Sequence, residues 1–483
     1  MPRESFPAEV SGHPLVGGLA DSVYTNAAEV PDFVQLERKV DGRWVEVTAR
    51  QFCDEVLALA KGLLARGLRF GNRVAIMART CYEWTLFNYA LWSIGAEVVP
   101  VYPTASAEQV RHILAETGAV ACVVEHEDHT MTLGAGISGL PALKWIWELN
   151  AGAVEEISAD AWQVSDDMVH RHRLAVTPDS MAAVVYTSGT TGLPKGCLVT
   201  HGNIMRQSDL MTERVRTALS PNGGTEPASL LLFLPLAHVY GLTVQVGCFR
   251  RRVRLAHQPC MSAADVLADL AALRPTFVPC VPSVFEKVFA AAQRKAEAEG
   301  HGKLFEQAVE TAVQYAEERE RQAFGRGKGP GVALRLRHRV YDRLVYSRVR
   351  EIFGGRMAYA GSGGSRLDRR LGLFFHGAGV TILDSYGLTE STAGVTCNPP
   401  DRPKFGTVGP PVGDTEIRIA EDGEILLRGP QVFSSYLGTG DGAYQRLRDG
   451  WLASGDLGTI DEDGYLIITG RKKDIIVTSR GKS

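Results

Sequence analysis

Apolar and polar positions follow two alternating periods along the chain, and this alternation predicts an α/β protein. Residues 49–65 carry apolar side chains at helical spacing, and the short apolar run Arg73–Met77 follows them. Two further apolar runs, 119–124 and 181–186, are each bounded by polar or turn residues. Strand-like runs that alternate with helix-like stretches are typical of parallel sheets covered by helices.

The segment Glu297–Arg350 has a different pattern. It is rich in Glu, Arg, Lys and Ala, and apolar residues such as Leu304, Ala308 and Ala312 recur at helical spacing. The glycine-rich break at 325–330 predicts two separate helices. A charge run of this kind is typical of a solvated helix face rather than of a binding surface.

Short alternating strands dominate the chain after residue 400. Residues 415–420 alternate, 423–429 form a strand pattern that ends in a Gly-Pro turn, and 452–468 predict two strands around an Asp-Glu-Asp-Gly turn. We therefore expect a small antiparallel β unit behind the α/β body.

One apolar stretch, 227–249, has no Asp, Glu, Lys or Arg and is long enough to span a membrane. It also contains Pro235, His238 and two glycines, which a spanning helix disfavours. We interpret it as a strand over 230–234, a turn and a buried helix, with the three arginines at 250–252 after that helix.

Composition narrows the class of protein. The 483 residues predict about three structural units. The formal net charge of −3 provides no global field that would favour nucleic acid or anionic lipid. The eight cysteines form no CxxC pair, which indicates buried reduced thiols. The N-terminus lacks the pattern of a signal peptide, so we expect a cytoplasmic protein.

The segment Tyr186–Gly196 has the composition of a phosphate-binding loop. It combines four small hydroxyl residues, three glycines and Lys195 directly after an apolar strand. Glycines let backbone N–H groups approach an anion, and the lysine adds a positive charge. The spacing differs from that of a Walker loop. A surface Gly/Ser/Thr loop is the alternative.

Four more segments follow this loop in order: 235–241 (PLAHVYG), 384–390 (DSYGLTE), 454–458 (SGDLG) and 470–474 (GRKKD). Together the five segments resemble the motifs of the adenylate-forming superfamily, which contains acyl-CoA synthetases, luciferases and the adenylation domains of peptide synthetases. Residues 100–108 and the helical segment 297–350 are similar to the long-chain fatty acyl-CoA synthetase branch.

The resemblance implies an organisation for the chain. Residues 1–470 would form a large N-terminal adenylation domain. Two α/β subdomains with mainly parallel sheets would cover about 1–400, and a small antiparallel β-barrel subdomain about 401–470. Residues 471–483 would be a hinge and the start of a C-terminal domain. In the family that domain supplies a lysine and rotates to build the thiol-transfer site, so this chain alone would turn over poorly.

The resemblance also implies an activity: ATP-dependent activation of a long-chain fatty acid to acyl-AMP, then transfer to CoA. ATP and CoA would be co-substrates and Mg²⁺ the metal. No nucleic acid and no transmembrane segment are expected, whereas peripheral membrane contact and a homodimer stay open. Two alternatives also stay open: a carrier protein or an amine as acceptor, and a non-catalytic nucleotide-binding relative.

Individual roles are carried over from the matching motifs. Glu390 would hold Mg²⁺, with Thr190 contributing, and Lys195, Thr389, Glu390 and His238 would be catalytic. His238 would orient the acyl carboxylate, with a structural histidine as the alternative. The nucleotide-binding residues would be Thr187, Ser188, Gly189, Thr190, Thr191, Gly363, Gly364, Ser365, Asp384, Ser385, Tyr386, Gly387, Thr389, Asp456, Arg471 and Lys473. The acyl-substrate residues would be His238, Tyr240, Gly241, Val281, Ser283 and Gly361.

Within these roles, Tyr386 would stack on adenine and Asp384 would reach its amino group. Asp456 would bind the ribose hydroxyls, and Lys473 would stand at the hinge. The chain departs from the family at Ser365-Arg366, where Ala-Pro is common, and this leaves the shape of the adenine pocket open.

Overall fold

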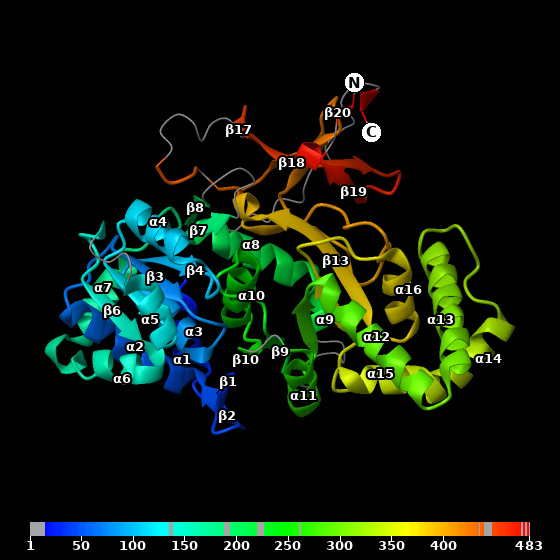
Figure 1. Ribbon diagram of the computed structural model, residues 1–483, viewed down its shortest axis with the longest axis horizontal. Helices are drawn as coiled ribbons and strands as arrows, with labels where there is room; N and C mark the ends of the chain where they lie inside the picture. The colour runs from blue at the N-terminus through cyan, green and yellow to red at the C-terminus, as the bar shows by residue number, and fades with distance from the viewer. Residues whose placement is uncertain are drawn as a thin grey trace.

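The computed structural model describes residues 15–134, 139–187, 194–219, 227–259, 262–433, 435–438, 447–474, 477–478 and 481–482. Two large, mainly parallel sheets covered by helices form the body, and an antiparallel sheet lies above them (Figure 1). The predicted fold class is confirmed: α/β with a small antiparallel unit late in the chain.

The first large sheet has six strands in the order β6-β5-β3-β4-β7-β8, all parallel except the last. The predicted helix 49–65 and strand Arg73–Met77 are α2 and β3. The strands are β3 (Arg73–Met77), β4 (Glu97–Val101), β5 (Ala121–Val124), β6 (Trp145–Glu148), β7 (Met181–Thr187) and β8 (Lys195–Thr200). Its helices are α2 (Ala49–Ala65), α3 (Tyr82–Ser93), α4 (Ala107–Thr117), α5 (Glu127–Gly134), α6 (Ala153–Ser158) and α7 (Asp166–Leu174).

The second large sheet has eight strands in the order β14-β13-β12-β11-β9-β10-β1-β2. Its six inner strands are parallel, and the outer strands β2 and β14 are antiparallel to their neighbours. The bounds are β1 (Val34–Val40), β2 (Arg43–Thr48), β9 (Ser229–Leu232), β10 (Arg254–His257), β11 (Phe277–Cys280), β12 (Tyr359–Ser362), β13 (Thr381–Leu388) and β14 (Ala393–Cys397).

Strand β13 changes partner type along its length. Its first half pairs in parallel with β12 up to Asp384, and its second half pairs antiparallel with β14 from Ser385 onward. The strand therefore leaves the parallel sheet and carries the residues that follow it, up to the short 3₁₀ turn Thr389–Ser391, above the sheet edge.

The helices between the two sheets share one core. Apolar side chains of α2, α3, α8 (His201–Arg214) and α10 (Val239–Arg250) pack in a single cluster with residues from both sheets. Among them, Trp84 and Trp92 on α3 are completely buried. The remaining helices of the body are α1 (Asp21–Glu29), α9 (Arg216–Leu219) and α11 (Ala263–Leu273).

The helical segment predicted at 297–350 forms a hairpin on the outside of the second sheet (Figure 1). Helix α13 ends at Ala323 and α14 begins at Val332, so the predicted break at 325–330 is confirmed. A π-helical turn, Asp342–Tyr346, continues α14. The helices are α12 (Pro282–Ala298), α13 (Gly302–Ala323), α14 (Val332–Tyr341), α15 (Ser347–Ile352) and α16 (Arg369–Gly377).

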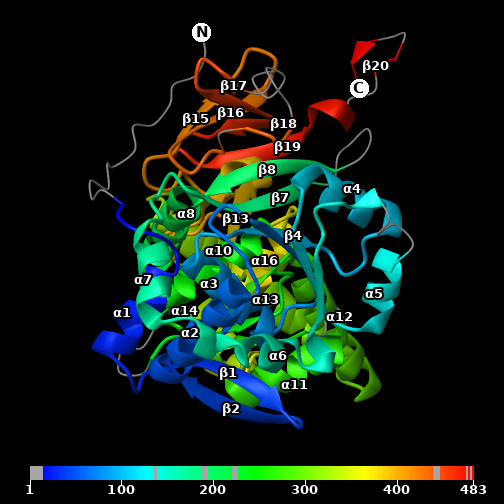
Figure 2. The same ribbon diagram turned by 90° about the vertical axis from the view of Figure 1, so that its left-hand side faces the viewer.

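A five-stranded antiparallel sheet covers the top of the body (Figure 2). Its order is β15-β16-β18-β17, and β19 pairs with β18 farther along that strand than β17 does, at Asp456–Ile460. The strands are β15 (Glu416–Ile419), β16 (Glu424–Arg428), β17 (Leu447–Arg448), β18 (Trp451–Ile460) and β19 (Leu466–Arg471), followed by the short pair β20 (Val477–Thr478) and β21 (Gly481–Lys482). The subdomain boundary near residue 400 stays a prediction.

The apolar stretch 227–249 forms strand β9, a turn and the buried helix α10, as predicted. No helix among the described residues combines the length and the apolar character that crossing a membrane requires. The seven described cysteines are all free thiols, and all but Cys81 are buried.

Candidate active site

A cavity of about 1570 Å³ opens where the three sheets meet. Its walls come from the ends of β7 and β8, the facing helices α8 and α10, the segments after β12 and β13, and the antiparallel pair β18–β19. Strand ends and turns contribute mainly charged and polar side chains to the lining, and the helices α8 and α10 contribute mainly apolar ones, together with Gln207, Ser208, Thr212 and Thr243.

Most of the predicted site residues line this cavity. They are Thr187, Lys195, His238, Tyr240, Gly361, Gly363, Gly364, Ser365, Asp384, Ser385, Tyr386, Gly387, Thr389, Glu390, Asp456, Arg471 and Lys473. Ser188, Gly189, Thr190 and Thr191 lie outside the described residues. Arg366, where the chain departs from the family, also lines the cavity.

Three predicted acyl-site residues, Gly241, Val281 and Ser283, are not among the lining residues. Gly241 lies in the first turn of α10, where a Cβ would meet the Pro235 carbonyl oxygen at 2.4 Å. Val281 precedes α12, and a Cβ on Gly364 would meet its Cγ1 at 3.8 Å. Gly241 therefore permits close packing of the turn before α10, and Val281 stands behind the cavity wall.

Asp456 is buried and lies at the centre of a polar group. It lies on β18 directly opposite Arg471 on β19. Arg471 Nε lies 3.1 Å from its Oδ1, and the Tyr386 hydroxyl donates a hydrogen bond of 2.8 Å to its Oδ2. Both carboxylate oxygens therefore have a partner from a different element, and these contacts fix the Asp456 side chain at the cavity wall.

Glu390 is held in a similar way at the 3₁₀ turn after β13. Its side chain is 6% exposed, and the Tyr436 hydroxyl donates to its Oε1 at 2.5 Å. Lys195 Nζ lies 5.7 Å above the Tyr436 ring, within range of a cation–π contact. Sequence reasoning missed Tyr436, which belongs to an irregular segment without a periodic pattern.

The wall between β12 and β13 is almost free of side chains. A Cβ on Gly363 would approach Ser385 Oγ to 3.1 Å, and Gly364 has a φ of +83°, a conformation that favours glycine. Ser385 Oγ donates to the Ser362 carbonyl at 2.7 Å, which ties the two strand ends together. The result is a stretch of cavity wall formed by backbone at Gly363 and Gly364.

Asp384 lies at the base of this wall. Burial raises its pKa from 3.8 to about 7. Its Oδ1 is buried and accepts no hydrogen bond from the residues that the structure describes. A buried acceptor without a partner is costly, so this atom fits a donor supplied by a ligand.

His238 is the N-cap of α10. Its Nδ1 accepts a hydrogen bond of 3.1 Å from the Tyr240 N–H, so in the neutral ring Nε2 carries the proton. The ring is accessible from the cavity, and enclosure by the surrounding walls lowers the pKa of His238. The residue therefore caps a helix and also presents a neutral donor to the cavity.

The apolar end of the cavity lies between α8 and α10. These two helices approach closely at Gly247, where a Cβ would meet Thr212 Cγ2 at 3.0 Å. Sequence reasoning missed this end, because most of its residues have the helical spacing of ordinary core residues. They are Met211, Val215, Leu219, Leu230, Val239, Val244, Cys248 and Val253.

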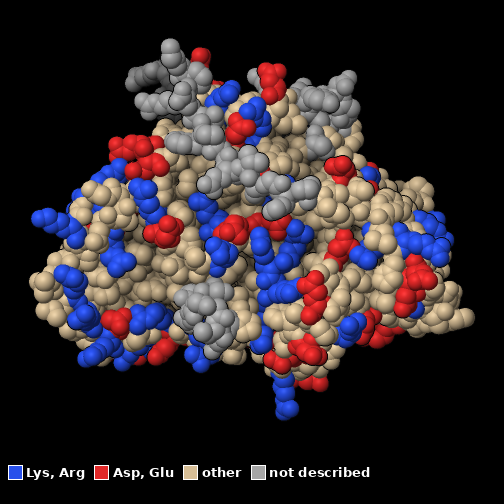
Figure 3. All heavy atoms as spheres, turned by 180° about the vertical axis from the view of Figure 1, so that it is seen from behind, with Lys and Arg blue, Asp and Glu red and all other residues tan. Residues whose placement is uncertain are grey.

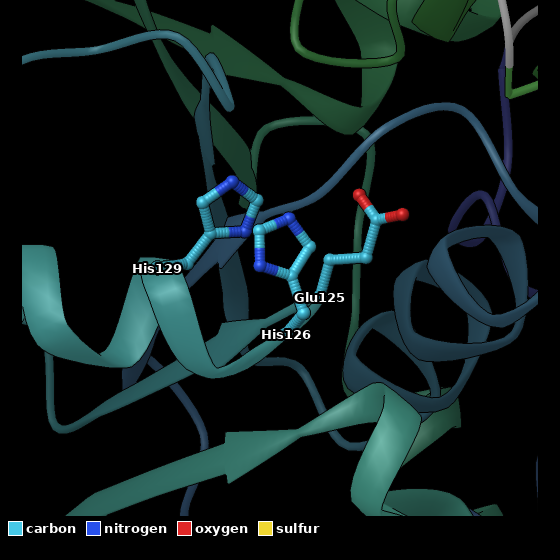
Figure 4. A group of neighbouring side chains, drawn as sticks. All are labelled: Glu125, His126 and His129. Carbon is cyan, nitrogen blue, oxygen red and sulfur yellow. The ribbon is translucent and has the colours of Figure 1, made fainter.

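A separate cluster of Glu125, His126 and His129 lies at the end of β5 (Figure 4). Its potential ligand atoms lie within 4.8 Å of one another. However, Arg79 already pairs with the Glu125 carboxylate, and the two imidazoles stack with centroids 4.0 Å apart and planes at 23°. The lone pairs of stacked rings run side by side and do not converge, so this geometry does not suit a metal ion.

The comparison with known families agrees with this fold and site. The model of the AMP-binding enzyme family matches residues 23–437. The chain belongs to this family, and the predicted membership of the adenylate-forming superfamily is confirmed.

Among curated proteins, the long-chain-fatty-acid–CoA ligase FadD15 of Mycobacterium tuberculosis is 39% identical over 481 residues, which cover 99% of this chain and 77% of that protein. The long-chain-fatty-acid–CoA ligase heimdall of Drosophila melanogaster is 29% identical and matches 91% of this chain and 66% of its own length.

Among solved structures, the O-succinylbenzoate coenzyme A synthetase MenE of Bacillus subtilis, in complex with ATP and magnesium, gives a TM-score of 0.70. The match covers 95% of this chain and 81% of that one at 20% identity. The anthranilate CoA ligase AuaEII gives a TM-score of 0.72, also at 20% identity. At this level of identity the two structures support the fold alone.

Proposed function

We propose that this protein activates a long-chain fatty acid at the expense of ATP. The acid carboxylate attacks the α-phosphorus of ATP, which forms an acyl-adenylate and releases pyrophosphate. The CoA thiol then attacks the acyl carbon, and AMP leaves. A free carboxylate is a poor electrophile, so the first step exists to supply AMP as a good leaving group.

The observation that carries this proposal is the two-ended cavity. Its polar end has the donors and acceptors that a nucleotide needs, and its apolar end has room for an alkyl chain. Each CH₂ group buried in such an arm would contribute roughly 0.8 kcal/mol to binding. The names of the relatives, long-chain-fatty-acid–CoA ligases, point to the same pair of substrates.

The nucleotide roles follow from the contacts at the polar end. Adenine would lie between Tyr386 and the backbone wall at Gly363–Gly364, with its amino group donating to the unpartnered Asp384 Oδ1. The ribose hydroxyls would donate to Asp456 and replace its present contact with Tyr386. Lys195 and Thr389 would neutralise and orient phosphate oxygens, because phosphoryl chemistry depends chiefly on positioning and charge.

Glu390 fits the demands of a magnesium site. Mg²⁺ prefers one or two carboxylates together with phosphate oxygens and water. Tyr436 fixes Glu390 through one oxygen at the cavity wall. When bound, the ion would neutralise charge on the phosphates. His238 would donate from Nε2 to the acyl carboxylate and orient it.

We also propose the domain division suggested by the sequence, with residues 471–474 as the hinge. Lys472 forms ion pairs with Asp422 at 2.6 Å and Glu424 at 2.8 Å, and Lys473 lines the cavity. The side chain of Lys472 thus ties the hinge to the antiparallel sheet, so a domain attached after it would pivot from that sheet.

A pyrophosphate-exchange assay with the whole chain, ATP, Mg²⁺ and saturated acids of increasing length tests the proposal. We expect exchange that depends on the acid and rises with chain length until the apolar arm is full. Adding CoA should release AMP and form a thioester. Exchange with short or aromatic acids alone would contradict the proposal that the substrate is a long-chain fatty acid. Thioester formation only on a carrier protein would contradict the proposal that CoA is the acceptor. Nucleotide binding with no acid-dependent exchange above the rate measured without protein would indicate a non-catalytic relative.

A further inference from the structure

Helix α14 presents an apolar stripe to solvent. Val332, Leu336, Val340 and Leu344 follow one another at intervals of four residues along α14 and its π-helical continuation. Their exposed fractions are 66%, 56%, 55% and 47%. Residues spaced by four lie on one face of a helix, so these side chains form one continuous strip.

The opposite face of α14 is already used for packing. The His338 ring stacks on Tyr315 of α13 with centroids 3.9 Å apart, and its Nε2 donates to the Gly377 carbonyl at 2.6 Å. The exposed strip is therefore not a face that turns inward by a small rotation of the helix. A solvated helix face, as expected from the sequence, explains the charges of this segment but not four exposed apolar side chains.

Arginines border the strip. Arg335, Arg339 and Arg343 each directly precede one of its apolar residues, and all three are exposed. No ion pair or hydrogen bond involves their side chains in the part of the chain that the structure describes. From Lys328 to Arg350 the sequence has seven Lys or Arg and one acidic residue, Asp342, which pairs with Arg350 at 2.6 Å. Figure 3 shows Lys and Arg gathering at this end of the molecule.

We infer that this face of α14 docks onto an anionic lipid surface. An amphipathic helix with apolar and arginine side chains on its outer face lies in the plane of a membrane interface, where the apolar strip inserts and the arginines meet lipid phosphates. A second copy of this chain would fit poorly, because a two-fold contact would bring the two rows of arginines together. Helix α14 lies well away from β20 in both ribbon views (Figures 1 and 2).

Vesicle flotation tests the docking without ATP or any acid, so its outcome is independent of the proposed reaction. We expect the whole chain to float with phosphatidylcholine vesicles that contain phosphatidylglycerol and not with pure phosphatidylcholine. Leu336→Glu/Val340→Glu should abolish flotation. Arg335→Gln/Arg339→Gln/Arg343→Gln should weaken it by about 100-fold, since each arginine near the surface contributes roughly fivefold.

Two control variants replace similarly exposed residues outside α14. Met131→Glu/Leu174→Glu replaces apolar side chains that are 69% and 73% exposed, and Arg43→Gln/Arg171→Gln/Arg216→Gln removes the same charge. Both should float as the parent does, and all variants should keep its thermal melting curve. Unchanged flotation of the α14 variants, equal loss in the control variants, or equal binding to neutral vesicles would overturn the inference. So would a dimer in light scattering that the α14 variants dissociate.

Discussion

The two ends of the cavity are built in different ways. Turns and strand ends form the polar end, and its side chains are fixed by partners from distant segments, such as Tyr386 and Arg471 on Asp456. The apolar end is formed by the facing sides of α8 and α10, and most of the side chains that line it are apolar. The first arrangement tolerates few substitutions, whereas the second can be reshaped by volume alone.

Glu390→Gln, at the polar end, should lower the rate of pyrophosphate exchange more than any other substitution proposed below. It keeps the size of the side chain and the Tyr436 contact but removes the charge that would hold the metal. Loss of one preorganised electrostatic group costs up to about 1000-fold in rate. We expect the rate of pyrophosphate exchange to fall by about that factor. Tyr436→Phe, which removes the hydroxyl that holds Glu390, should lower the same rate about tenfold. Glu299→Gln, on an exposed glutamate, is the matched control, and an equal fall there would refute the assignment.

Asp384→Asn tests whether burial of a carboxyl group at the polar end lowers the stability of the folded protein. The folded pKa of Asp384, about 7, lies above the ordinary 3.8, so the folded state favours the neutral acid, and stability is lost as pH rises between these values. Asp384→Asn lacks this ionisation. Its melting temperature relative to the parent should therefore increase from pH 4 to pH 7.5, by the equivalent of at most about 4 kcal/mol. A pH-independent difference would contradict the buried carboxyl.

Asp456→Asn removes one charge and weakens the contact with Arg471. Hydrogen bonds to a charged group are worth about 1.5–3 kcal/mol, so the KM for ATP should rise roughly 10- to 100-fold. The KM for the acid should stay the same, because the residue lies at the polar end. Steady-state kinetics with each substrate varied in turn would show this split, and an equal rise in both KM values would argue against a nucleotide role.

Val244→Phe examines the apolar end. The added volume should remove space for two or three CH₂ groups and weaken binding of the longest acids about 15- to 60-fold. The preferred chain length should shorten, while the KM for ATP should not change. Val244→Ala should shift the preference toward longer acids. An unchanged length profile in both variants would place the alkyl chain elsewhere.

The sequence predicted the elements with strong patterns. The helix at 49–65 and the strand Arg73–Met77 match α2 and β3, because their apolar periodicity extends over the whole element. The residues of the polar end were also named in advance, since their side chains occur in short motifs of unusual composition. Their convergence on one cavity depends on contacts between distant parts of the chain, which no local pattern encodes.

The apolar end was not predicted for a physical reason. Met211 and Val215 have the i, i+4 spacing of any buried helix face, so nothing local distinguishes a cavity wall from a packed core. Tyr436 was missed because it reaches Glu390 from 46 residues away through an irregular segment. Of the predicted residues Gly241, Val281 and Ser283, only Gly241 directly follows a lining residue, Tyr240, and neighbours in sequence need not share a surface.

The stretch from Asp384 to Glu390 sets the distance between two parts of the polar end. Its ends are six residues apart, and it runs along β13 to Leu388 and ends in the 3₁₀ turn Thr389–Ser391, so it spans less than the roughly 20 Å of six fully extended residues. If the base is bound near Asp384 and the metal at Glu390, this stretch fixes the distance between them. One residue inserted within β13 would lengthen the interval and turn the side chains between the insertion and the end of the strand to the opposite face. In this stretch the number of residues is therefore as constrained as their identity.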